Sequence, residues 1–263
     1  MFTLPQPKYE VTAKAYRNAH IYSIDGEKLP SVTKILQIIG GGKMNALMIW
    51  ARREALKLAE SELFKAIEDN RTLTYESVAE MLKACDRQPD KIKEASADLG
   101  TRVHEAIDAY ILGKEPVLDE ESTIGFTNFL NWLNMQGMEL VSGDIPVASK
   151  RLGYGGRLDA LGLKDGRIFV LDWKTSNALR EEYPLQVAAY AYAFKEMYGL
   201  PVAGATVVRF DKTDPNIFEA KDIDMTHALG AWLSAISSSS ATASAAILSL
   251  SAFWSPVIAD IGC

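Results

Sequence analysis

Apolar residues recur at helical spacing in the first half of the chain and in strand-like runs in the second half. The helical pattern predicts helices over about residues 31–39, 43–70, 75–85, 90–112, 121–135 and 183–197. The strand-like runs predict strands over about residues 140–149, 154–163, 167–173 and 202–210. We therefore expect a mixed α/β (α+β) fold in which a central mixed β-sheet is flanked by helices, preceded by a helical N-terminal part.

The turn between the second and third predicted strands is the sharpest local signal. Lys164-Asp165-Gly166 has the composition of a tight hairpin turn. The following run from Ile168 to Leu171 is continuously apolar, as in a strand covered on both faces. The two strands should therefore pair directly.

The C-terminal region is unusual because residues 225–259 contain no Asp, Glu, Lys or Arg. The apolar run from Ala241 to Ile258 raises the question of a membrane span. Serine and threonine interrupt this run and no basic flank anchors it, so we expect no membrane association. The expectation is a disordered or aberrant tail over residues 237–263.

Composition narrows the class of protein. Hydrophobic residues make up 48% of the 263 positions and charged residues 24%, which is typical of a globular protein. The net charge of −6 argues against indiscriminate phosphate binding, although an acidic site can meet phosphates through a divalent cation. Two cysteines exclude a disulfide framework and a four-cysteine zinc or iron–sulfur site. With no evident signal peptide, a cytoplasmic location is expected.

Asp159, Asp172 and Lys174 form the strongest chemical constellation. Side chains alternate along a strand, so Asp172 and Lys174 share one face and Trp173 faces the other way. The hairpin brings Asp159 beside them. Two adjacent carboxylates repel each other unless a divalent cation such as Mg²⁺ lies between them. Lys174 could then orient or deprotonate an attacking water, although two solvated charges at a strand end would give the same pattern.

Two further candidates come from helices. Gln186 and Tyr190 lie one helical turn apart, so they could bind a nucleotide, hold Lys174, or be part of a helix with a partly buried tyrosine. His104 lies at the edge of an apolar stripe, with Asp108 four residues later. It could be a structural histidine paired with Asp108, or a metal ligand that Asp108 orients.

Together, these motifs resemble the PD-(D/E)XK nuclease superfamily in its RecB-like exonuclease branch. The resemblance rests on His104, GGRLD ending at Asp159, LDWK ending at Lys174, and Q-x-x-x-Y from Gln186 to Tyr190. The early LPSVTKIL and the spacing from Asp144 to Asp159 are similar to the mitochondrial genome maintenance exonuclease and its phage relatives. The resemblance covers about residues 20–212.

The resemblance implies a restriction-endonuclease-like core and cleavage of DNA phosphodiesters, often from single-stranded ends, in repair, recombination or replication. It implies Mg²⁺ or Mn²⁺ held by His104, Asp159, Asp172 and the Trp173 carbonyl, with Lys174 catalytic. Gln186 and Tyr190 would complete the catalytic site. A phage-encoded enzyme would act in the cytoplasm of the host cell.

The expected organisation is one nuclease domain over residues 1–236. It would carry a helical insertion over about 43–113 and a catalytic core over about 118–236. Asp144 stands where many relatives have Glu, and the cysteines of iron–sulfur relatives are missing, so no cluster is expected. Two alternatives remain: a catalytically weak nuclease-like fold that binds DNA ends or a partner, and an unrelated α+β protein with coincidental motifs.

Overall fold

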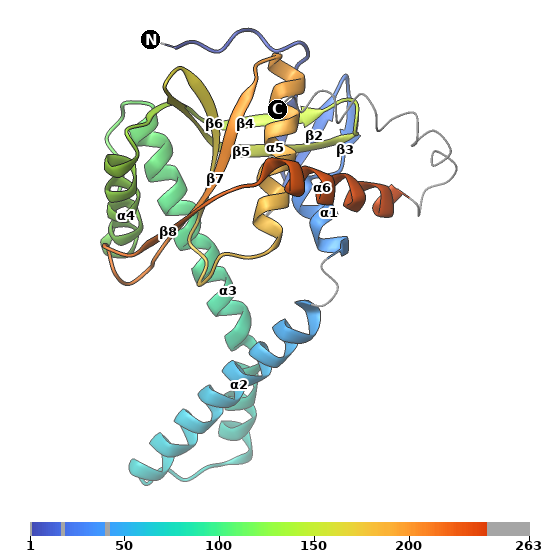
Figure 1. Cartoon of the computed structure of the whole chain (residues 1–263). Coiled ribbons are helices and arrows are strands. Elements are labelled where there is room, and N and C mark those ends of the chain that lie inside the picture. The colour runs from blue at the N-terminus through green and yellow to red at the C-terminus, as the bar shows by residue number, and fades with distance from the viewer. Residues whose placement is uncertain (1, 17–18, 40–42, 241–263) are drawn as a thin grey trace. The chain divides into compact units, whose positions relative to one another are not determined.

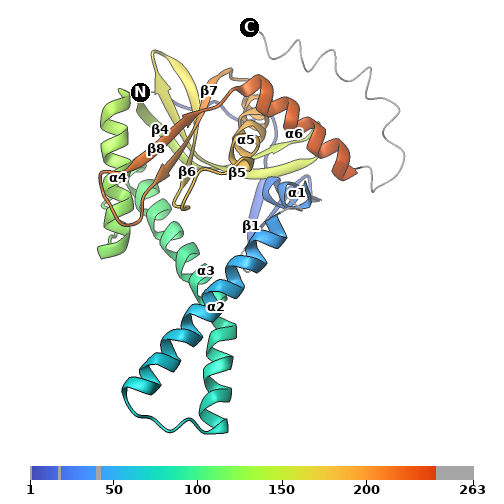
Figure 2. The same ribbon diagram turned by 60° about the horizontal axis from the view of Figure 1, so that its bottom comes forward.

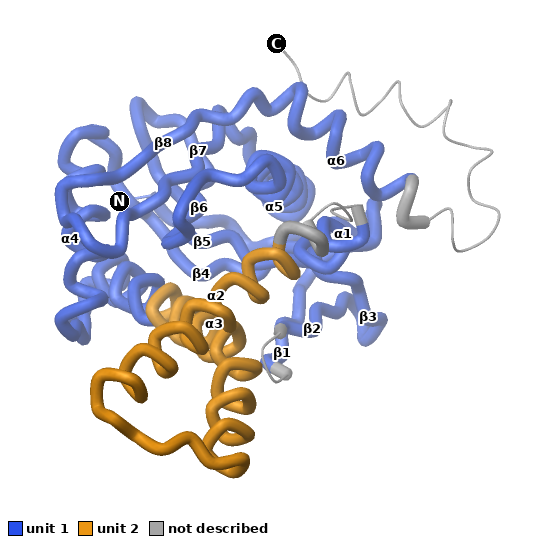
Figure 3. The backbone as a smooth tube through the Cα atoms, turned by 90° about the horizontal axis from the view of Figure 1, so that it is seen from below, with its two compact units in different colours: residues 1–39, 102–263 blue, residues 40–101 orange. Residues whose placement is uncertain are grey.

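The computed structural model describes residues 2–16, 19–39 and 43–240. It divides into two compact units, residues 1–39 with 102–263 and residues 40–101 (Figure 3). The first unit holds two sheets and most of the helices, and the second is helical. The predicted single-domain organisation over residues 1–236 stays a prediction.

A five-stranded mixed sheet forms the centre of the first unit (Figure 1). Its strands, in spatial order, are β4 (Glu139–Ser149), β5 (Tyr154–Lys164), β6 (Arg167–Lys174), β7 (Val202–Phe210) and β8 (Phe218–Asp222). All neighbours are antiparallel except β6 and β7, which run parallel. Parallel neighbours need a crossover connection, and α5 (Glu182–Tyr198) supplies it. The predicted fold class is confirmed.

The predicted hairpin between β5 and β6 is also confirmed. Asp165 and Gly166 both have positive φ values, 50° and 71°, as a type I′ turn requires. Lys164 pairs with Arg167, and the ladder continues to Ala160 opposite Leu171. The next positions along the two strands are Asp159 and Asp172, so the turn sets the register that brings these carboxylates together.

Helices cover both faces of the central sheet (Figures 1 and 2). On one face, α5 packs against β4 to β7, with α1 (Val32–Ile39) and α6 (Met225–Ser240) beside it. On the other, α4 (Glu120–Gln136) packs on β7 and β8. Trp173 of β6 meets Phe129 and Trp132 of α4 edge to face, at ring-centroid distances of 5.6 and 5.3 Å. Because side chains alternate, this anchor turns Asp172 and Lys174 towards α5.

A second, antiparallel sheet precedes α1, where the sequence showed only short alternations of polar and apolar residues. It consists of β1 (Thr12–Tyr16), β2 (Ala19–Ile24) and β3 (Glu27–Leu29). Tyr22 of β2 is buried over β5, where a Cβ on Gly155 would lie 2.5 Å from the tyrosine Cβ. Gly155 N–H also donates to the Pro30 carbonyl at 3.0 Å. The small sheet and the start of α1 are therefore attached to the strand that carries Asp159.

The charge-free C-terminal region begins with an ordered helix. In α6, Trp232 is fully buried and packs edge to face on Tyr154 at 5.0 Å. Ala228, Leu229 and Ala235 are buried with it at helical spacing, which the sequence analysis did not use. Strand β8 was also missed. The predicted tail lies outside the described residues beyond position 240, and no helix of the described part is long and apolar enough to cross a membrane.

The second unit contains α2 (Lys43–Glu68) and most of α3 (Tyr75–Ile111). The prediction of two separate helices over 75–85 and 90–112 was wrong, because α3 runs through Pro89 without a break. Proline removes one N–H and disfavours an interior position, but it does not stop a helix whose other hydrogen bonds remain. The last turns of α3 belong to the first unit and carry His104.

Candidate active site

The carboxylates of Asp159 and Asp172 meet where the ladder between β5 and β6 ends. One oxygen of Asp159, Oδ2, accepts a hydrogen bond of 2.7 Å from the Trp173 backbone N–H. This bond fixes the orientation of the carboxylate against the next strand. Burial raises the pKa of Asp159 above its usual range, and the Lys174 ammonium partly opposes this.

Asp172 and Lys174 form a buried ion pair. The Asp172 side chain is 1% exposed; its Oδ2 contacts the Lys174 ammonium, and its Oδ1 has no hydrogen-bond partner among the described residues. Burial raises the pKa of Asp172 to about 6, although the adjacent ammonium opposes the rise. Burial lowers the pKa of Lys174, but the two carboxylates, Asp172 first, outweigh it and leave the pKa raised. Lys174 also lies 5.0 Å from the centre of the Tyr183 ring, a cation–π contact that sequence reasoning missed.

His104 reaches these residues from the last part of α3. Its Nδ1 lies 3.7 Å from Asp159 Oδ1, too far for a hydrogen bond. The Trp173 backbone beside the ring raises the pKa of the imidazole. Burial and the Lys174 ammonium outweigh this and lower the pKa of His104 to about 4. The ring is therefore neutral at pH 7, the form that can bind a metal.

The prediction that Asp108 partners His104 is not supported, because no hydrogen bond joins them within the described part of the chain. Burial raises the pKa of Asp108 to about 7, and the nearby carboxylates Asp144 and Asp159 add to the rise. Asp108 therefore belongs to an acidic group beside the site and does not orient the imidazole.

Gln186 and Tyr190 are brought to the site by α5. Gln186 Nε2 donates to the Tyr190 hydroxyl at 2.8 Å, so these two residues hold each other, and Lys174 is held by Asp172. The Tyr190 ring lies directly on Gly156 of β5, where a Cβ would come within 2.3 Å of Tyr190 Cε1. A glycine at this position is therefore what lets the tyrosine approach the strand of Asp159.

An arginine next to the site was not singled out from the sequence. Arg157 Nη1 lies 2.7 Å from each oxygen of Asp144, and its Nε is buried without a partner among the described residues. Asp144 has a φ of 53°, a conformation that non-glycine residues rarely adopt. The GGRLD run carried a signal for Arg157, since side chains two residues apart share a strand face.

The donor set fits a hard divalent cation. Asp159, Asp172 and the Trp173 carbonyl offer oxygen atoms and His104 a neutral nitrogen, which suit Mg²⁺ or Mn²⁺. The buried Asp172 Oδ1, which has no hydrogen-bond partner among the described residues, is the kind of atom that a cation stabilises. Nevertheless, no three His, Cys, Asp or Glu side chains of the described residues already stand as a ligand set. The ion pair with Lys174 takes the place of a cation at Asp172.

Comparison with known families defines the class of this domain. Residues 130–249 match the family described as the PD-(D/E)XK nuclease superfamily. This region contains both aspartates, Lys174, Gln186 and Tyr190, while His104 precedes it. Residues 130–249 therefore carry a PD-(D/E)XK nuclease superfamily domain, which suggests nuclease activity.

Comparisons with individual proteins do not define the function more closely than the family match. No curated protein matches the chain. Among the solved structures that match is the crystal structure of SSO0001, at 16% identity and a TM-score of 0.31. The match covers 56% of this chain and 63% of that one, so this chain spans less than two thirds of that protein.

Proposed function

We propose that the protein is a metal-dependent DNA exonuclease of the RecB-like branch, similar to the mitochondrial genome maintenance exonuclease and its phage relatives. It would hydrolyse phosphodiester bonds of single-stranded DNA or DNA ends in recombination, repair or replication. The observation that carries the proposal is the convergence of His104, Asp159, Asp172 and Lys174, from one helix and two paired strands, beside the backbone of Trp173.

In this proposal, His104, the two carboxylates and the Trp173 carbonyl hold Mg²⁺ or Mn²⁺. The cation would polarise the phosphate and offset its charge. Lys174 would donate from its ammonium to the attacking water or to a phosphate oxygen. It is the basic group in contact with Asp172, which in this proposal holds the cation beside the phosphate. The Trp173 N–H keeps Asp159 in place through its hydrogen bond.

Tyr190 has a donor role in the same proposal. Its hydroxyl oxygen accepts from Gln186, so its own proton stays available for another acceptor. A phosphate oxygen close to Asp172 could accept that proton. Gln186 acts as the positioning residue for this contact.

The test uses end-labelled linear DNA, single- and double-stranded, with Mg²⁺, Mn²⁺ or EDTA, beside a covalently closed single-stranded circle. An exonuclease shortens the linear strand from one end in the presence of metal and leaves the circle intact. Cleavage of the circle would show an endonuclease. DNA binding without cleavage under any metal condition would instead favour the nuclease-like binding module.

A further inference from the structure

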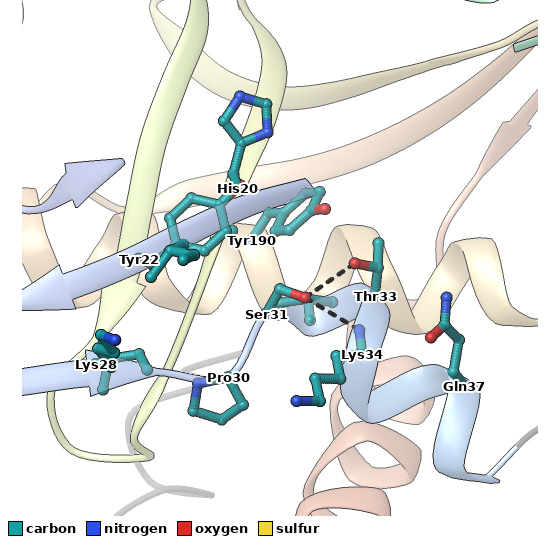
Figure 4. A pocket seen from close by; sticks show the side chains of 13 residues that line it. His20, Tyr22, Lys28, Pro30, Ser31, Thr33, Lys34, Gln37 and Tyr190 are labelled. Atoms are coloured by element: carbon teal, nitrogen blue, oxygen red, sulfur yellow. Dashed lines mark hydrogen bonds between the residues drawn. The ribbon is translucent and has the colours of Figure 1, made fainter. Parts of the chain in front are cut away.

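A cavity of about 820 Å³ lies beside the catalytic groups, between the small sheet, α1 and β5 (Figure 4). Its volume lies within the range of about 300–1,000 Å³ that is usual for small-ligand sites. Polar side chains that line it include His20, Tyr22, Lys28, Thr33, Lys34 and Tyr190, which come from β2, β3, α1 and α5, together with Ser31 and Gln37. All of them belong to one compact unit.

The charge of this cavity is opposite to that of the chain. Lys28 and Lys34 line it, and none of its described lining residues is acidic, although the chain has a net charge of −6. Both lysines are exposed, and neither forms an ion pair with a described residue. Two ammonium groups without carboxylate partners attract an anion, and a cavity focuses that attraction.

Aromatic rings supply the second feature. Tyr22 and Tyr190 are almost fully buried at the cavity, at 5% and 4% exposure. His20 is exposed beside Tyr22, with ring centres 6.3 Å apart (Figure 4). Aromatic faces beside cations are the combination with which proteins bind unpaired nucleotides, because each base has a stacking face and each linkage a negative charge.

The third feature is the connection to the catalytic groups. Tyr190 lines the cavity and is hydrogen-bonded to Gln186. Gly156 lines it too, and lies on the same strand as Asp159, three residues earlier. A strand whose scissile phosphate lies at Asp159 and Asp172 therefore has its neighbouring nucleotide within reach of this cavity.

We infer that the cavity binds one unpaired nucleotide of the substrate strand, next to the bond that is cleaved. Its phosphate would lie against Lys28 and Lys34 and its base against the exposed ring of His20, next to the buried Tyr22. This inference rests on the proposed function, and it specifies a single strand as the form of DNA that the site accepts. A base-paired nucleotide has its stacking faces covered by its neighbours and would not enter.

The first test reverses the charge of the cavity with a matched control. Lys28→Glu/Lys34→Glu is compared with Lys164→Glu/Lys221→Glu, which changes the net charge equally but lies outside the cavity lining. Binding of a labelled single-stranded oligonucleotide is measured in EDTA, so that cleavage plays no part. We expect the cavity variant to weaken binding at least tenfold and the control less than threefold. The slope of log affinity against log salt should fall by about 0.7 for one phosphate that is no longer neutralised on a single strand.

Equal effects of the two double variants would overturn the inference, and so would an equal loss of duplex binding and single-strand binding by the cavity variant. The cleavage assay separates this inference from the proposed function. If the wild-type protein cleaves DNA and the two double variants bind alike, only the cavity assignment fails. If the wild-type protein never cleaves but the cavity variant alone loses binding, only the proposed function fails.

A second test addresses the base. One abasic position is moved along the oligonucleotide, and binding to the wild-type protein is measured for each position. A base held against the aromatic rings predicts at least a fivefold loss at one position counted from the strand end. His20→Ala should reduce this positional difference. Losses that are uniform along the strand would exclude a base-binding cavity.

Discussion

At the residue scale, the site depends on one buried charge balanced by another. Asp172 is 1% exposed and Lys174 16%, so neither charge is well solvated. Removing one partner of a buried pair leaves the other uncompensated, with a typical cost of about 3–5 kcal/mol. Variants of these residues therefore need a stability measurement beside each activity measurement.

Lys174→Ala should abolish cleavage and leave metal and DNA binding largely in place. A lysine is not a metal ligand here, and one phosphate-side cation is a small part of the binding energy. Loss of a transition-state contact predicts a fall in rate of roughly 10²–10³. The assay is single-turnover cleavage of labelled DNA, with Lys164→Ala as the matched control and thermal unfolding of both. A folded Lys174→Ala protein that cleaves at the wild-type rate would contradict the assigned role.

Asp172→Asn should act on metal binding itself. An amide oxygen is a poorer ligand for a hard cation than a carboxylate. We expect the Mn²⁺ dissociation constant, measured by calorimetry, to rise at least tenfold, while single-stranded DNA binding in EDTA changes little. Unchanged Mn²⁺ affinity would remove Asp172 from the metal site.

Gly156→Ala should disrupt the approach of Tyr190 to β5. The added Cβ would lie 2.3 Å from Tyr190 Cε1, so the ring must move. Overpacking of this kind typically destabilises by about 1–3 kcal/mol. Urea unfolding gives this change, and cleavage should fall with it. Gly230→Ala is the control, because its Cβ meets nothing within 4 Å and alanine stabilises a helix by about 0.5–1 kcal/mol. If Gly156→Ala were neutral in both assays, the close packing of Tyr190 would not matter.

At the element scale, the connection between β7 and β8 is organised by Asp211. Its Oδ1 accepts from the Thr213 N–H, the Thr213 hydroxyl and the Asp214 N–H at 2.9, 2.8 and 3.2 Å. These bonds, the Thr213 backbone bond first, lower the pKa of Asp211 to about 2. The carboxylate is therefore more easily ionised in the folded protein than in the unfolded chain.

The sign of the pH effect follows from this lowered pKa. Asp211 stabilises the fold above the unfolded-state value of 3.8, and this contribution is lost as the pH falls through about 2. Asp211→Ala should lower the free energy of unfolding at pH 6 by about 1–2 kcal/mol, the usual value of such local bonds. The difference from the wild-type protein should narrow below pH 4 in urea titrations. A difference that stays constant down to pH 2 would show that ionisation of Asp211 has no part in it.

Helix α6 is an element that the sequence analysis did not predict. Residues up to 236 were expected in the core, but no helix was predicted there because attention went to the lack of charges after residue 225, yet Leu229, Trp232 and Ala235 line a buried stripe. A helix packed on the rest of the protein needs an apolar face more than it needs charges on its other face. Hydrophobic spacing was therefore the better guide here than composition.

At the scale of the whole molecule, the position of the last necessary residue can be tested by truncation. Deleting the residues after Ile236 should leave folding and cleavage intact, because the buried Trp232 and Ala235 of α6 remain. A truncation before Met225 removes Trp232 and should prevent folding, since loss of a buried tryptophan side chain alone costs about 3–5 kcal/mol. Solubility, circular dichroism and cleavage would be compared. An insoluble or inactive protein ending at Ile236 would show that the tail contributes to the fold.

The sequence alone determined the order of the main strands, the hairpin and the candidate site residues. Those features are local: a type I′ turn needs Asp165 and Gly166, and the alternation along a strand places Asp172 and Lys174 on one side. The prediction that His104 lies beside Asp159 needed the family resemblance in addition, because no local pattern links a helix to a strand over 50 positions away.

Only the tertiary structure decided which groups face each other. The ion pair between Arg157 and Asp144, the ring of Tyr183 over Lys174, and the separation of His104 from Asp108 depend on how elements pack. The cavity beside Tyr190 depends on the small sheet of β1 to β3. No periodic pattern in the sequence indicates that this sheet packs on β5. Side-chain packing and burial are properties of the assembled fold, since each contact joins residues that the chain brings together only after its helices and sheets have formed.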